Sequence, residues 1–230
     1  MTSLPTLFRR LALAALALHA FVTSAVAAED FSPAERALFM TNHLAATQPP
    51  ATLRYNFAHS GSEDAAFEDK VAVKLKATPS GKCCAAEAEF LTGTRRLSLP
   101  EVEQAEGNPA VLYFLERDIR EMNRLTKGQQ NYFRKRIRMA VYQGAAIQDV
   151  TVSYRGKPVP AREIRIAPYL DDPLRVRFEK YANKTYVFTL SDAVPGGLYA
   201  IRTRVDGATP EAPPLIAEEM VLDGGMPSAR

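Results

Sequence analysis

The chain has 230 residues, of which 47% are hydrophobic, 29 are basic and 26 are acidic. Residues 1–28 contain two of the basic residues and none of the acidic ones, which leaves the rest of the chain with a net charge of about +1. This balance argues against a dedicated nucleic-acid binder, which would show a clear basic excess. About 200 residues follow position 28, enough for one domain with a sizeable core.

Residues 1–28 have the features of a secretory signal peptide. Two arginines precede an apolar stretch, residues 11–22, and small residues follow at 25–28. The apolar stretch is too short to span a membrane comfortably. We therefore expect a periplasmic or secreted protein whose mature chain has no transmembrane span.

The sequence between Ser32 and Thr94 predicts one helix followed by an antiparallel meander. Ser32 and Glu35 suit a capping box at the start of a helix that we expect to continue to about Ala46. Alternating apolar residues then predict three strands, and the turns between them are too short for parallel crossovers. The predicted strands cover residues 51–58, 67–77 and 84–94.

Residues 107–142 predict two amphipathic helices joined by a turn at Gly128. Asn108 can cap the first helix, and Pro109 suits its first position. The apolar residues at helical spacing are Leu112, Leu115, Ile119 and Met122 in the first helix and Phe133, Ile137, Ala140 and Val141 in the second. We expect the charged residues of the first helix to form a compensated surface: Glu116, Arg117, Asp118, Arg120, Glu121 and Arg124.

The second half of the chain returns to strand-type sequence. The predicted strands cover residues 147–154, 161–166, 186–190, 198–205 and 214–222, with a short helix over 174–181 that Asp172 can cap. This order predicts a single α+β domain, residues 29–223, built on a curved antiparallel sheet of about seven or eight strands with helices packed over one face. Residues 224–230 are expected to form a flexible tail.

The order of elements carries a resemblance. A helix, a strand with Tyr55 and Phe57, and a meander precede a helix that starts at Gly107-Asn108-Pro109. In this order the chain resembles an uncharacterised family of exported proteobacterial proteins, and it is similar to the lipoprotein-carrier fold, a curved antiparallel half-barrel around an apolar cavity. The resemblance implies a fold and a carrier role, and it implies no functional residue.

We expect an exported, non-catalytic binding or carrier protein whose small apolar or lipid-like ligand lies in a cleft between the sheet and the central helices. The candidate lining residues are Tyr55, Phe57, Phe90, Leu112, Phe114 and Leu115. The alternative is that these side chains fill a solid core. The sequence has no P-loop, HExxH or CxxC motif, so we expect no cofactor and no metal, and an enzyme is disfavoured.

Two other functions stay open. One is a secreted hydrolase that uses His59, which begins a turn rich in hydroxyl and carboxylate groups at residues 59–64 and would need a distant partner. The other is a module that docks an envelope protein through the basic helix, residues 129–142. We expect the cations of this helix to form a solvated face, and the alternative is a patch for an anion or a phospholipid headgroup: Arg134, Lys135, Arg136 and Arg138.

The two cysteines, Cys83 and Cys84, are adjacent. An exported compartment permits disulfides, but neighbouring side chains of a strand point to opposite faces, which makes a bridge between them awkward. We expect two free thiols, with Cys84 facing the core and Cys83 facing solvent. A vicinal disulfide and a two-thiolate grip on a metal are the alternatives.

Overall fold

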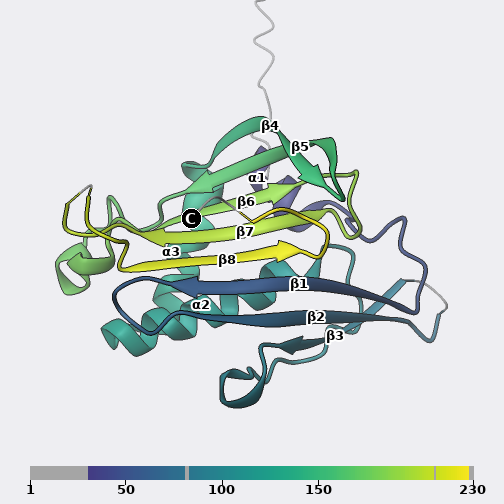
Figure 1. Cartoon of the computed structure of the whole chain (residues 1–230), viewed down its shortest axis with the longest axis horizontal. Coiled ribbons are helices and arrows are strands. Elements are labelled where there is room, and N and C mark those ends of the chain that lie inside the picture. Colours follow the sequence, from purple (N-terminus) through teal and green to yellow (C-terminus); the bar gives the residue numbers. More distant parts are fainter. Residues whose placement is uncertain (1–30, 81–82, 210, 228–230) are drawn as a thin grey trace, which may run out of the picture. The chain divides into compact units, whose positions relative to one another are not determined.

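The structure, a computed structural model, describes residues 31–80, 83–209 and 211–227, so the predicted signal peptide lies outside the described residues. Eight strands form one open antiparallel sheet in the order β3-β2-β1-β8-β7-β6-β5-β4 (Figure 1). The strands are β1 Ala51–Ser60, β2 Phe67–Ala77, β3 Cys83–Phe90, β4 Ala146–Tyr154, β5 Lys157–Ile166, β6 Thr185–Leu190, β7 Leu198–Val205 and β8 Ile216–Leu222. Together with the helices on one face, this confirms the predicted α+β class.

Two long helices, α2 (Pro109–Thr126) and α3 (Gln130–Gln143), cover one face of the sheet (Figure 1). The side chain of Asn108 caps α2 by accepting a hydrogen bond from the Ala110 amide at 3.0 Å, as the sequence predicts. Lys127, in the left-handed conformation, follows the last residue of α2. No helix within the described part of the chain has the length and apolarity needed to cross a membrane.

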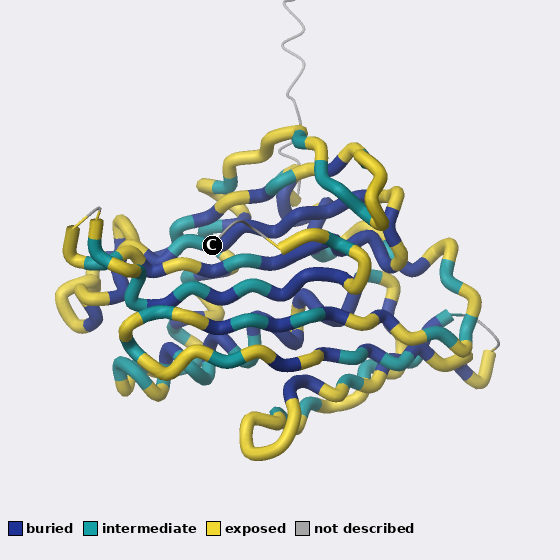
Figure 2. The backbone as a smooth tube through the Cα atoms, in the orientation of Figure 1, coloured by how far each residue is buried: buried dark blue, intermediate teal, exposed yellow. Residues whose placement is uncertain are grey.

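The core lies between the sheet and α2. Along β1 and β2, buried residues alternate with more exposed ones (Figure 2). The ring of Phe57 lies 6.2 Å from the ring of Phe90 and 6.2 Å from that of Phe114, centroid to centroid. These contacts join β1, β3 and α2 directly. The space between sheet and helix is therefore filled by aromatic side chains at this point.

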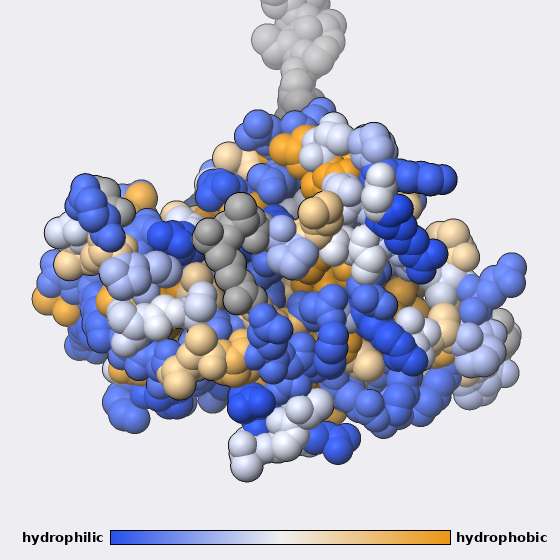
Figure 3. Space-filling view, viewed as in Figure 1, coloured by the Kyte–Doolittle hydropathy of each residue, from blue (hydrophilic) through white to orange (hydrophobic). Residues whose placement is uncertain are grey.

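The opposite face of the sheet is mostly hydrophilic (Figure 3). Exposed side chains of β2 and β3 form cross-strand ion pairs on it, for example Lys74 with Glu89 at 2.5 Å and Lys76 with Glu87 at 2.7 Å. A sheet with one polar face and one apolar face explains the alternation seen in the sequence.

The first helix is shorter than predicted. The capping box is present, because Ser32 Oγ accepts from the Glu35 amide and the Ser32 amide donates to Glu35. However, α1 (Pro33–Glu35) passes into a π-turn, η1 (Arg36–Met40), and the chain leaves the helix at Thr41 instead of Ala46. The imidazole of His43 explains the early end, since Nε2 donates to Ala37 O and Nδ1 accepts from the Asn108 amide, which ties this segment to the start of α2.

The predicted helix over residues 174–181 is also wrong. The structure has two 3₁₀ turns there, η3 (Arg175–Arg177) and η4 (Glu179–Tyr181), although Asp172 does accept a hydrogen bond from the Leu174 amide. Phe178 separates the two turns with a non-helical φ of −146°, and its ring packs edge-on against those of Phe133 and Tyr169. Tertiary packing of one aromatic ring has overridden the helical spacing.

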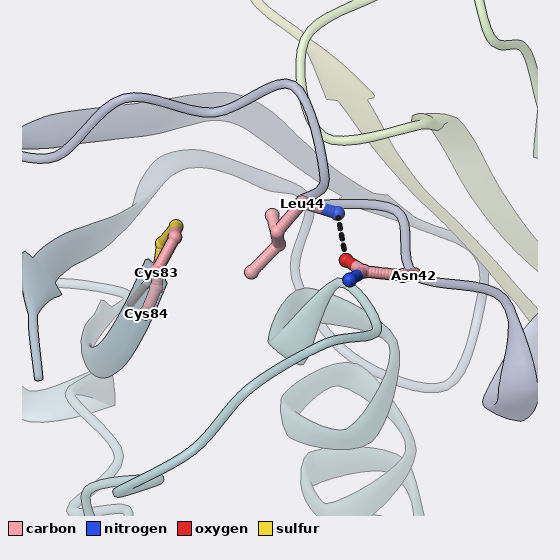
Figure 4. The surroundings of a disulfide bond; sticks show 4 residues. All are labelled: Asn42, Leu44, Cys83 and Cys84. Carbon is pink, nitrogen blue, oxygen red and sulfur yellow. Dashed lines mark hydrogen bonds between the residues drawn. A yellow bond between two sulfur atoms is a disulfide. The ribbon is translucent and has the colours of Figure 1, made fainter. Parts of the chain in front are cut away.

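Cys83 and Cys84 form a disulfide (Figure 4), so the expectation of free thiols is wrong. The register between β2 and β3 shifts here: Ala77 pairs with Cys83, whereas Lys76 pairs with Ala85. Cys84 is thus an extra residue in a bulge, and regular strand geometry, which would separate the two sulfurs, does not apply. Cys84 is fully buried, as predicted, and Cys83 is partly buried. The side chain of Leu44 points toward the pair (Figure 4).

Candidate functional site

An apolar groove of about 710 Å³ lies along the side of α2 that is turned away from the sheet. Its α2 residues Leu112 and Ile119 lie across the helix from Phe114, which contacts β1. Its other walls come from residues 31–40, residues 99–102 and α3. The apolar lining residues are Phe31, Phe39, Met40, Leu99, Pro100, Val102, Leu112, Tyr113, Leu115, Ile119 and Ile137.

Three large apolar side chains of the groove remain open to solvent. Leu112 and Met40 are each 53% exposed, and Phe31 is 36% exposed. Scattered exposed apolar residues are normal on proteins, but a contiguous apolar concavity marks a binding surface. Leu112 shares its helical spacing with Met122, which is fully buried, so spacing alone does not separate the two environments. Helix α2 has one apolar side against the sheet and a second along the groove.

Charged side chains surround the groove, and cations predominate among them. Arg120 and Arg134 both pair with Glu116, at 3.0 and 2.8 Å. Partial burial works to raise the pKa of Glu116, but hydrogen bonds from these two arginines lower it below its ordinary value. Glu35 is the other acid of the rim. Arg138 also lines the groove, and it has no acidic partner within the described residues.

The predicted ligand-lining residues do not all lie at one site, and neither do the predicted cations of the basic helix. Tyr55, Phe57, Phe90 and Phe114 are each at most 1% exposed in the core, whereas Leu112 and Leu115 line the groove. Of the four cations of the basic helix, Arg134 and Arg138 lie at the rim of the groove, and Lys135 is exposed. Arg136 turns toward Asp172, at 2.8 Å. The four cations therefore do not form one continuous patch.

A second polar site crosses the sheet beneath α2. Four buried side chains stand in one row because their strands pair in register: His59 with Glu218, Glu218 with Thr203, and Thr203 with Tyr186. The row consists of residues from β1, β8, β7 and β6, which are far apart in sequence. One signal was available in the sequence, since Glu218 shares the strand parity of apolar neighbours that face the core.

Helix α2 supplies charged partners to this row. Arg117 Nη1 donates to both carboxylate oxygens of Glu218, each at 2.6 Å. Asp118 accepts from the hydroxyl of Tyr186 at 2.6 Å and pairs with Lys184, whose side chain is fully buried. The prediction that Arg117 and Asp118 belong to the solvated helix surface is wrong, because Asp118 is fully buried and Arg117 largely so.

Glu218 is an ionised carboxylate at the centre of this network. Burial works to raise its pKa, but the charge of Arg117 and the hydrogen bond from His59 lower the pKa to about 2. His59 Nδ1 lies 2.8 Å from Glu218 Oε1, and the imidazole stacks on Phe67 with centroids 5.1 Å apart. His59 thus lies within β1 and is buried, not at the start of an exposed turn.

The pairing of His59 with Glu218 bears on the predicted hydrolase. A carboxylate that orients an imidazole is one part of a catalytic triad. The other nitrogen, Nε2, is buried and has no hydrogen-bond partner in the described part of the chain, so no hydroxyl or thiol nucleophile is bonded to it there. The geometry supplies an oriented base without a nucleophile.

A smaller pocket of about 460 Å³ adjoins His59. Phe67, Leu91 and Leu97 form its apolar lining. The charged residues of its wall are Asp64, Arg95, Arg117, Arg120, Glu121 and Arg124. The wall of this pocket therefore carries four arginines and two acids.

Comparisons with known proteins do not place the chain in a family. No family model matches the chain, and no curated protein matches it. Among solved structures, the crystal structure of the Mycobacterium tuberculosis lipoprotein LppX matches with 10% sequence identity and a TM-score of 0.31, over 82% of this chain and 93% of that one.

Proposed function

We propose that the protein is a non-catalytic binding or carrier protein, and that it holds an amphiphile with an apolar chain and an acidic head in the groove beside α2. One observation carries the proposal: the groove of about 710 Å³ keeps Leu112 and Met40 open to solvent between two helices. Small-molecule sites are concave, mainly apolar and range from about 300 to 1,000 Å³. The groove has all three properties.

The apolar lining of the groove determines how much binding free energy the hydrocarbon chain of a ligand contributes. Each methylene moved from water into an apolar site contributes about 0.8 kcal/mol. Two added methylenes should therefore strengthen binding by about 1.6 kcal/mol, or roughly 15-fold, until the groove is full. A ligand with a long saturated chain suits this surface better than a compact polar one.

The cations of the rim favour an acidic head. Glu116 already neutralises part of the charge of Arg120 and Arg134, whereas Arg138 has no anion within the described residues. A guanidinium can hold a carboxylate or a phosphate through two parallel hydrogen bonds. An acidic head placed beside Arg138 would supply the missing anion while its chain covers Leu112.

We propose the periplasm or the extracellular space as the site of this activity. The support is the predicted signal peptide at residues 1–28. A carrier in such a compartment would keep an acyl-type chain out of water between two membranes or membrane complexes.

Displacement of a fluorescent fatty acid by dodecanoic acid tests the proposal. A Leu112→Glu variant should weaken binding by at least tenfold, because it adds a charged side chain to the apolar part of the groove at a position that tolerates exposure. Val176→Glu is the matched control, since Val176 is 81% exposed and lies on η3, outside the groove. Arg138→Gln should weaken the binding of dodecanoic acid more than the binding of dodecanol. Equal affinities of the wild type and the Leu112→Glu variant would overturn the proposed site.

A further inference from the structure

We propose that the outer face of α3, together with residues 167–178 beside it, docks the protein onto an anionic phospholipid membrane. We call this the α3 surface. It lies on the side of α3 away from the groove, whose wall is formed by other residues of the helix. The inference does not rest on the function proposed for the groove.

Residues 167–178 run antiparallel to α3 and in contact with it. Leu170 and the end of α3 line one hollow of about 430 Å³, and Leu174 and the start of α3 line another of the same size. Between the two hollows, Arg136 of α3 pairs with Asp172 at 2.8 Å. The helix and the segment therefore form one continuous surface.

Large apolar side chains of the α3 surface are open to solvent. Val176 is 81% exposed, Leu170 47% and Leu174 40%, all within seven positions of the chain. Tyr142, near the end of α3, is 50% exposed. Single exposed apolar residues are normal on proteins, whereas several on one surface mark a contact with a partner or a membrane.

Cations without an acidic partner among the described residues accompany these apolar side chains. The exposed cations are Lys127, Lys135, Arg175 and Arg177. Lys135 lies two turns before Tyr142, on the same side of α3. Lys127 and Arg177 line the hollow at the start of α3, and no acid lines that hollow within the described residues. The exposed acids next to these cations are Asp171 and Glu179, so positive charge predominates.

This combination matches the interface of an anionic bilayer. Apolar side chains enter the boundary between headgroups and acyl chains, while lysine and arginine stay level with the phosphates. Each cation near an anionic bilayer strengthens binding about fivefold. The opposite face of the sheet is mostly hydrophilic, and its charges are paired, as in Lys74 with Glu89 (Figure 3). The α3 surface should therefore face the membrane.

A tryptophan reporter tests which side meets the lipid. The chain has no tryptophan, so Val176→Trp introduces a single one. With vesicles of phosphatidylethanolamine and phosphatidylglycerol, its emission should shift to shorter wavelength, and acyl-chain-brominated lipids should quench it. Thr52→Trp, at an exposed position of β1 on the hydrophilic face, is the control and should show neither effect. Every protein begins at residue 29, because the apolar stretch at residues 11–22 would itself enter lipid, and the described fold begins at residue 31.

Substitutions that keep the fold test the two components of binding by vesicle sedimentation. Val176→Glu should weaken binding at least tenfold, because it removes an inserting side chain and adds a negative charge. The double variant Lys135→Gln, Arg177→Gln should weaken binding to the anionic vesicles roughly 25-fold. Lys74→Gln, Lys76→Gln is its matched control, since it changes the net charge equally on the hydrophilic face and should bind almost like the wild type.

The groove variant separates this surface from the groove. Leu112→Glu should bind vesicles like the wild type even if it has lost dodecanoic acid, whereas Val176→Glu should lose vesicles and keep dodecanoic acid. Loss of vesicle binding in Leu112→Glu alone would assign membrane contact to the groove and overturn the proposal.

Three further results would overturn it. The first is no binding to anionic vesicles, the outcome expected if the α3 surface docks a protein. The second is equal quenching of the tryptophans at positions 52 and 176. The third is an equal loss of binding in the two double variants, which would show that only the net charge of the protein matters.

Discussion

The carboxylate of Glu218 should contribute about 3 kcal/mol to the free energy of unfolding at pH 7, and a Glu218→Gln variant should lose this contribution. Burial of Glu218 raises its pKa, but the charge of Arg117 and the hydrogen bond from His59 outweigh this effect and lower the pKa from 4.5 to about 2. At about 1.4 kcal/mol per pH unit, that change corresponds to about 3 kcal/mol. The variant also leaves Arg117 without its anion, and breaking one side of a buried ion pair costs about 3–5 kcal/mol. The free energy derived from the pKa therefore agrees with that expected for breaking a buried ion pair.

The pH dependence of stability provides the sharper test. Because the pKa of Glu218 is lower in the folded protein than in the unfolded chain, its stabilisation is present above pH 4.5 and is lost as pH falls toward 2. Wild type should therefore lose more stability than the Glu218→Gln variant between pH 5 and pH 2.5, and the difference between them should shrink. Urea unfolding followed by circular dichroism at several pH values measures this difference.

The control for this experiment is Glu89→Gln. Glu89 pairs with Lys74 on the hydrophilic face of the sheet, and its side chain is 47% exposed. This variant should unfold almost like the wild type at every pH, since exposed ion pairs contribute little. A Glu218→Gln variant within about 1 kcal/mol of wild type at pH 7, or with the same deficit at pH 3 as at pH 7, would refute the reasoning.

The remaining predictions concern the cysteines and the first helix. Thiol reagents should label neither Cys83 nor Cys84 in the unfolded protein until the disulfide is reduced; labelling before reduction, counted by mass spectrometry, would contradict the bond. After reduction of the folded protein, the partly buried Cys83 should react before the fully buried Cys84. Ser32→Ala should lower the free energy of unfolding by about 1 kcal/mol, because it removes the acceptor for the Glu35 amide, and an unchanged urea midpoint would count against the capping box.

Local rules account for most of the fold that the sequence predicts. Alternation in the strands and the Asn108 cap of α2 follow from short-range pattern, and the structure has both. The early end of the first helix and the break at Phe178 do not follow from local pattern. Each depends on a contact with another segment. His43 accepts a hydrogen bond from the Asn108 amide, and the ring of Phe178 packs on that of Phe133 in α3.

The candidate sites were harder to predict, for two physical reasons. A helix such as α2 can bury one apolar side and leave another open, and spacing alone does not tell which side Leu112 belongs to. Asp118 stands among arginines in the sequence and looks solvated, yet its partners Lys184 and Tyr186 come from more than 60 residues away. The row beneath α2 exists only once the strands are paired.

The central claim is that the groove beside α2 holds an acyl-type chain, and the chain-length dependence of affinity tests it most directly. Dissociation constants for saturated acids of eight, ten and twelve carbons should fall by roughly 15-fold per two methylenes in the wild type and in Val176→Glu, until the groove is full. In Leu112→Glu the affinities should be weaker and their dependence on length should flatten. Affinities independent of chain length in the wild type, or an unchanged dependence in the Leu112→Glu variant, would contradict the claim.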